Sequence, residues 1–156
     1  MMRRKRLEPV HELALEAERA AARRLAEAER DALDCQARLT QLETYEREYR
    51  VGLQRRVTEG IGAAGLRDFQ SFLARLDQAV GQQRAVLERA LTAREAAREQ
   101  WLALSARRRS VGKVLEQSET ADRRALERRE QRELDERAMG SLRESCTDED
   151  AGRGRG

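Results

Sequence analysis

One glycine-rich break, residues 60–65 with the sequence GIGAAG, separates two long stretches made largely of helix-forming residues. The chain's one proline, Pro9, stands before both stretches and leaves the rest of the chain free to stay helical. Most of the aromatic residues lie near the break, on one side or the other. The sequence therefore predicts an all-α fold, a long two-helix antiparallel coiled-coil hairpin with aromatic residues near its turn that are suited to contacts.

Composition excludes a thick globular core. Charged residues make up 39% of the chain and aromatic residues 3%, which leaves too little apolar material to fill one. Alanine, leucine, glutamate and arginine dominate, and this bias is typical of long helices. With 156 residues the chain has room for one domain.

Apolar or small residues recur at alternating steps of three and four on both sides of the break, the spacing of a coiled-coil seam. In the first stretch the seam positions are Val10, Ala14, Ala17, Ala21, Leu25, Ala28, Ala32, Cys35, Leu39, Leu42, Tyr49 and Leu53. In the second they are Phe69, Leu73, Leu76, Val80, Gln83, Leu87, Ala90, Arg94, Ala97, Trp101, Leu104, Arg108, Val111, Leu115 and Ser118. This pattern predicts helix one over residues 9–57, a tip loop over 58–65 and helix two over 66–138.

The two ends of the chain differ from the predicted coiled coil, which spans residues 9–139. Residues 1–8 are basic and precede Pro9, so we expect a flexible N-terminus there. Residues 140–156 are rich in Ser, Thr, Asp and Gly, so we expect a disordered tail.

The charge pattern argues against nucleic acid as a partner. The 32 basic and 29 acidic side chains give a net charge of +3, but the two signs are finely interspersed and form no broad positive face. Short basic runs occur only at residues 3–6 and 107–109. We therefore expect a protein partner.

The residues that usually carry chemistry are scattered, so we expect no enzyme, no cofactor, no metal and no small-molecule ligand. Cys35, Cys146 and His11 share no metal-ligand spacing, and Cys35 fits a buried, reduced thiol. The break reads GxGxxG, but the polar residues 55–59 precede it where a nucleotide-binding fold needs a buried strand. The glycines more simply end one helix and turn the chain.

Neither a secretory signal nor a membrane span is expected. The basic start leads into Pro9 instead of an apolar run, and no window approaches the roughly 20 apolar residues that a spanning helix needs.

Near the break the apolar side of each helix is wider than a two-stranded seam requires. Leu42, Tyr45 and Tyr49 share one face of helix one, and Phe72 and Ala79 flank the seam on helix two. Two interpretations are equally open. These residues either thicken the core beside the turn or form an exposed patch for a partner. Trp101, midway along helix two, is expected to pack between the helices.

These residues resemble the FliJ proteins of the bacterial flagellar type III export apparatus, and the likeness covers most of the chain. The residues that make the resemblance most specific are Leu42, Tyr45, Tyr49, Gly60, Phe69, Phe72, Leu73, Leu76, Ala79, Val80 and Gln83. Trp101 with the basic segment after it, and the run ELDER at residues 133–137, also match. The arginine-rich basic charge and the polar end beyond Gly140 depart from the family's usual pattern.

The resemblance implies a non-enzymatic stalk that inserts into a hexameric export ATPase, stimulates it, couples it to the membrane export gate and escorts export chaperones. It also implies a cytoplasmic protein, peripherally associated with the inner membrane at the export apparatus. The gate-binding patch implied for this chain is Leu42, Tyr45, Tyr49, Phe72, Leu76, Ala79 and Gln83.

Three alternatives stay open on the sequence alone. The chain is also compatible with the equivalent stalk of a virulence-type injectisome, with a basic coiled coil that binds nucleic acid, and with half of a larger homo-oligomeric bundle.

Overall fold

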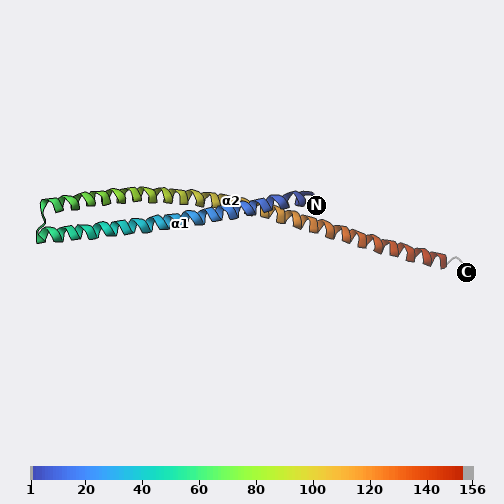
Figure 1. Cartoon of the computed structure of the whole chain (residues 1–156). Helices are drawn as coiled ribbons and strands as arrows, with labels where there is room; N and C mark the ends of the chain where they lie inside the picture. Colours follow the sequence, from blue (N-terminus) through green and yellow to red (C-terminus); the bar gives the residue numbers. More distant parts are fainter. Residues whose placement is uncertain (1, 153–156) are drawn as a thin grey trace. The chain divides into compact units, whose positions relative to one another are not determined.

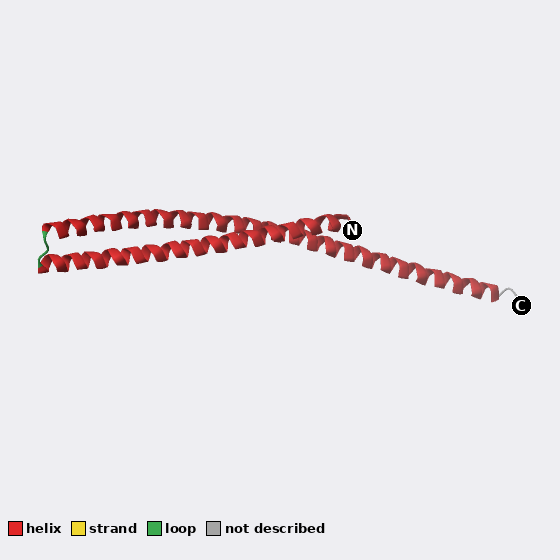
Figure 2. Cartoon of the chain, in the orientation of Figure 1, coloured by secondary structure: helices red, strands yellow, loops and turns green. Residues whose placement is uncertain are grey.

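Two long helices make up the described part of the chain. The computed structural model describes residues 2–152, as helix α1 (Met2–Glu59) followed by helix α2 (Ala63–Gly152). Figure 1 places the break between them at the turn of a hairpin. Figure 2 shows helix in the rest of the described residues, with no strand among them. The two helices pack against each other, which confirms the predicted all-α hairpin.

The contacts between the helices establish the antiparallel direction. Arg50 pairs with Asp77 and Arg84 with Glu43. Gln83, the residue before Arg84, donates a side-chain hydrogen bond to the Cys35 carbonyl at 3.1 Å, again to an early part of α1. Partners on α1 therefore lie earlier in the chain as those on α2 lie later.

The helices extend beyond the ends predicted for them at residues 9, 57, 66 and 138. At the start, Arg4 bonds Glu8 one turn along at 3.0 Å and lies 3.7 Å from Glu119 of α2, so Pro9 stands inside α1. Near the end of α2, the Thr147 hydroxyl donates a hydrogen bond to the Glu144 carbonyl at 2.8 Å within the helix. Residues 1 and 153–156 lie outside the described residues, and the division into the three predicted segments stays a prediction.

The chain forms two compact units, each described by itself. Unit 1 consists of Met1–Ala14 and Arg108–Gly156, and unit 2 of Leu15–Arg107. In unit 1, Ala14 is buried and a Cβ at Gly112 would lie 3.2 Å from the His11 ring, so the backbones approach closely there. From 123 to 149 every residue of α2 is exposed.

Unit 2 contains most of the buried residues, namely Ala21, Ala32, Leu39, Val80 and Ser105. They stand on the predicted seams or next to them, and all other predicted seam residues are at least half-buried except Val10 and Arg94. Val10 is exposed because its neighbour His11 faces α2 instead. Arg94 is exposed because burying a guanidinium without a carboxylate would cost several kcal/mol. Cys35 is half-buried and not enclosed, a correction to the expected buried thiol.

The turn is shorter than the predicted loop over 58–65, since only residues 60–62 lie outside helix. Gly60 ends α1 with a φ of 95°, a left-handed conformation that other residues adopt at a cost. The Gly62 carbonyl accepts a hydrogen bond from the Leu66 amide at 3.0 Å, which starts α2 at once. Three residues, with Gly60 in the left-handed conformation, are thus enough to make the turn.

Two glycine-to-alanine changes are expected to have opposite effects. Gly60→Ala should lower the free energy of unfolding by about 1 kcal/mol, because alanine disfavours positive φ. Gly52→Ala, inside α1 and with no atom near its added methyl group, should raise that free energy by about 0.5–1 kcal/mol. Urea unfolding followed by helicity measures both, and a destabilised Gly52→Ala beside an unchanged Gly60→Ala would contradict the turn described.

Candidate interaction surface

Close to the turn, one edge of the hairpin is held by ion pairs. Arg50 bonds Glu46 at 2.6 Å and Asp77 at 3.1 Å, and Arg84 lies 3.4 Å from Glu43. A hydrogen bond with Glu46, supported by the Arg50 guanidinium, lowers the pKa of the Asp77 carboxyl. We refer to these five residues as the ionic edge. Exposed pairs of this kind add little stability but restrict how the helices are paired.

The other edge is aromatic. The Tyr49 ring lies 4.9 Å from the Phe69 ring and 4.5 Å from the Phe72 ring, measured between centroids. Phe72 precedes Asp77 by five residues, about 140° around the helix, so it lies on the opposite flank of α2. On α1, Tyr45 precedes Arg50 by five residues as well, so it lies on the flank of α1 opposite to Arg50. Tyr45 also lies one turn before Tyr49. We refer to Tyr45, Tyr49, Phe69 and Phe72 as the aromatic edge.

The aromatic edge is divided between packed and exposed rings. Tyr49 is half-buried between its two partners, and the Arg56 guanidinium covers Phe69 at 5.5 Å from the ring centroid. Tyr45, in contrast, is 65% exposed and Phe72 is 42% exposed. Each of the two sequence interpretations therefore fits part of the set, with Tyr49 in the core beside the turn and Tyr45 at the surface.

The remaining members of the predicted patch are less accessible. Leu42, Leu76 and Ala79 are half-buried along the seam or its flank. Gln83 is also half-buried, and its amide already donates to the Cys35 carbonyl. The structure brings all seven residues to the same part of unit 2 but leaves two rings, Tyr45 and Phe72, as the large exposed apolar groups.

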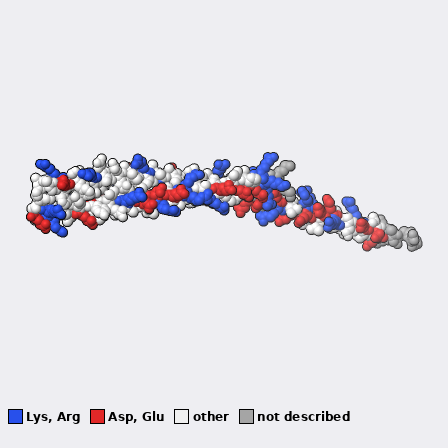
Figure 3. Space-filling model, in the orientation of Figure 1, with Lys and Arg blue, Asp and Glu red and all other residues white. Residues whose placement is uncertain are grey.

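On the α2 side of this surface, charge is sparse. Between residues 69 and 83 of α2, Arg75 and Asp77 are the only charged side chains. Figure 3 shows the same contrast, with a mostly uncharged face near the turn and a dense mixture of both signs farther along unit 2. Exposed rings beside a sparsely charged stretch of helix are typical of a protein contact.

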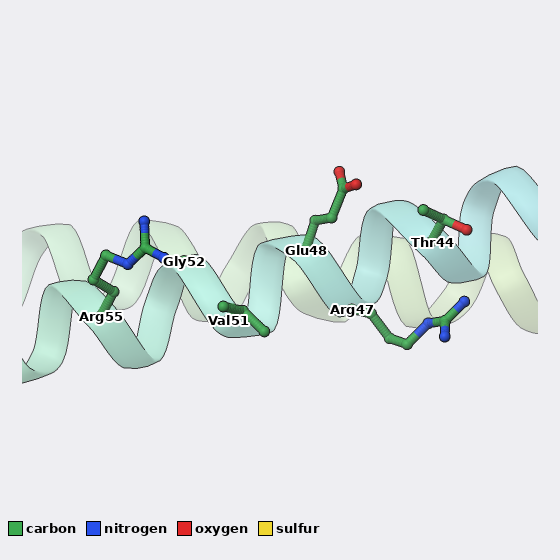
Figure 4. Close-up of a pocket in the computed structure, with 6 residues that line it drawn as sticks. All are labelled: Thr44, Arg47, Glu48, Val51, Gly52 and Arg55. Atoms are coloured by element: carbon green, nitrogen blue, oxygen red, sulfur yellow. The ribbon is translucent and has the colours of Figure 1, made fainter.

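A shallow groove on α1, which the sequence analysis missed, lies away from α2. Its lining is Thr44, Arg47, Glu48, Val51, Gly52 and Arg55, drawn in Figure 4. The missing side chain of Gly52 opens it beside Val51, which is 56% exposed. A glycine inside a helical pattern could have signalled it. Because one helix supplies every wall, the groove cannot enclose a small molecule.

The described residues offer little for chemistry. No group of three or more His, Cys, Asp and Glu side chains among them could hold a metal ion. In the same part of the chain no helix combines the length and the apolar character that crossing a membrane requires. Trp101 is half-buried, and it lines a groove between the helices with Leu25 and Arg98.

Comparison with known proteins identifies the family. The model of the flagellar FliJ protein family matches residues 2–145, nearly the whole described chain. Searches of curated proteins and of solved structures found no match. The match spans both helices and the aromatic edge, and it confirms the resemblance drawn from the sequence. The chain belongs to the FliJ family, whose members are non-catalytic components of flagellar protein export.

Proposed function

We propose that this FliJ-family protein is the stalk of the flagellar export apparatus, inserting into the hexameric export ATPase and stimulating it. The observation that carries the proposal is a helical hairpin with exposed rings beside its turn, in a chain of the flagellar family. Such a shape acts through contacts. In this account the protein works in the cytoplasm, peripherally associated with the inner membrane at the export apparatus, and it also escorts export chaperones.

The ATPase contact is assigned to unit 1, which holds the early part of α1 and the late part of α2. Residues 123–149 of α2 are exposed throughout, so unit 1 itself leaves this surface uncovered. Arginine and glutamate alternate over much of it, which suits contacts with both signs of charge in a surrounding ring.

The gate contact is assigned to Leu42, Tyr45, Tyr49, Phe72, Leu76, Ala79 and Gln83. In this account Tyr45 and Phe72 touch the gate's cytoplasmic domain directly, because they are the exposed rings. Tyr49 and Gln83 act by holding the shape of the surface, since each already has a partner within the hairpin. Large aromatic groups are the usual anchors of such contacts.

Stimulation of the ATPase is the first test of this function. One copy of the protein per ATPase hexamer should raise the steady-state rate of ATP hydrolysis, and an excess should add little because one hairpin fills one ring. An unrelated antiparallel coiled coil of similar length and charge is the control. A hydrolysis rate unchanged at equimolar addition and in excess would count against the stalk function.

A further inference from the structure

A second groove, in unit 2 and separate from the aromatic edge, lies between the helices. It is lined by Leu25, Glu29 and Leu33 of α1 and by Arg94, Arg98 and Trp101 of α2. We refer to it as the Trp101 groove. Neither the predicted gate patch nor the assigned ATPase contact includes any of these six residues.

The groove exists because Arg94 stands at a seam position. The three-four repeat would give this position an apolar side chain, but the guanidinium stays outside and is exposed. On α1 the neighbouring seam residues are alanines, half-buried Ala28 and buried Ala32, which are too small to fill the space. An opening beside Trp101 is the result.

The groove has an apolar side. Leu33 is 71% exposed, the largest exposed fraction among the large apolar residues of the described chain. Leu25 and Trp101 are half-buried and line the same space. Covering a leucine of this exposure with another apolar side chain would strengthen binding, because it removes apolar surface from water.

The groove also has a cationic side. Arg94 and Arg98 are exposed and one helical turn apart, so their guanidinium groups reach the same rim. Within residues 2–152 neither forms an ion pair, although Glu29 lines the same groove. Two arginines against one glutamate leave the lining with a net positive charge.

We propose that the Trp101 groove binds an acidic amphipathic helix of a partner protein. One large apolar side chain of that helix packs against Leu33 and Trp101, and carboxylates one turn apart on it pair with Arg94 and Arg98. A groove between two helices favours a third helix, because helices bury apolar side chains best along a shared groove. Nucleic acid fits less well, since exposed Leu33 offers nothing to phosphates and Glu29 repels them.

Trp101 supplies the signal for a test, because it is the single tryptophan of the chain. The full-length protein is titrated with a designed helical peptide of about 20 residues, long enough to hold a helix. The peptide carries leucines along one side and glutamates at one-turn spacing beside them. We expect a saturable change in Trp101 emission, and no such change with a peptide in which every glutamate is lysine.

Two variants and a matched control locate the binding. Arg94→Glu with Arg98→Glu should weaken peptide binding about tenfold or more, which corresponds to about 1.4 kcal/mol. Leu33→Ala should weaken it severalfold, and because Leu33 is so exposed this change should leave folding intact. Arg19→Glu with Arg23→Glu makes the same change of charge at the same spacing on exposed α1 residues outside the groove, and affinity should stay within about twofold.

Three results would overturn the proposal. One is the absence of a saturable signal up to about 1 mM peptide, an affinity too weak for a specific site. Another is equal binding of the lysine peptide. The last is binding of single-stranded DNA or of anionic lipid vesicles with the same loss in the arginine variant but none in Leu33→Ala, since the groove would then act by charge alone.

Discussion

Replacing Ala21 with glutamate is expected to lower the free energy of unfolding by about 3 kcal/mol or more, the largest effect of any single change considered for this chain. Ala21 is 1% exposed, the lowest value among the buried residues. A glutamate there would have to bury its carboxylate or push α1 away from α2. At about 2–4 °C per kcal/mol for a chain of this size, the melting temperature should fall by roughly 10 °C. Thermal unfolding followed by circular dichroism at neutral pH measures it.

Ala22→Glu is the matched control, since Ala22 is adjacent but exposed. The same glutamate should change the free energy of unfolding by less than about 0.5 kcal/mol there, because its carboxylate stays in water. Equal melting temperatures for the two variants would mean that the helices are not in close contact at Ala21.

The two tyrosines of the aromatic edge are expected to respond differently to alanine. Tyr49→Ala should lower the free energy of unfolding by about 1–3 kcal/mol, because it removes the ring that packs against Phe69 and Phe72. This loss of stability is smaller than the loss expected for a fully buried ring, because Tyr49 is half-buried. Tyr45→Ala should change it by less than about 0.5 kcal/mol, since the Tyr45 side chain is mostly in water.

Urea unfolding of the two single variants measures this difference. Equal losses of stability would contradict the division between a packed and an exposed ring. A large loss of stability in Tyr45→Ala alone would show that Tyr45, and not Tyr49, is the packed ring. The double variant alone cannot separate these cases, because lost packing at Tyr49 would also distort the surface around Tyr45.

The fold could be predicted because a single repeat runs along most of the chain. Steps of three and four place one residue in each turn against the other helix, so residues such as Leu39 and Val80 were predicted on the seam and are buried. The glycines were predicted to end the first helix and turn the chain, and Gly60 does so with a positive φ. Helix ends were harder, since hydroxyl groups that favour caps and turns, such as that of Thr147, also bond backbone carbonyls inside a helix.

The site was predictable only in part. Periodicity places Tyr45 and Tyr49 on one face of α1, but which ring is packed depends on which residues of α2 lie opposite. Phe69 and Phe72 meet Tyr49, and that register requires both helices to be placed. The Trp101 groove could not be predicted either. Arg94 was predicted on the seam, and only the structure shows that its side chain is exposed.

The central claim is that the exposed rings beside the turn carry the contact with the export gate. Binding of the gate's cytoplasmic domain by Tyr45→Ala tests this claim most directly. The wild-type protein should bind the purified domain, and Tyr45→Ala should bind it about tenfold or more weakly while keeping wild-type helicity and stability. Arg19→Glu with Arg23→Glu, on exposed residues of α1 away from the aromatic edge, should bind like wild type. Wild-type affinity in Tyr45→Ala, or no binding by the wild-type protein, would contradict the claim.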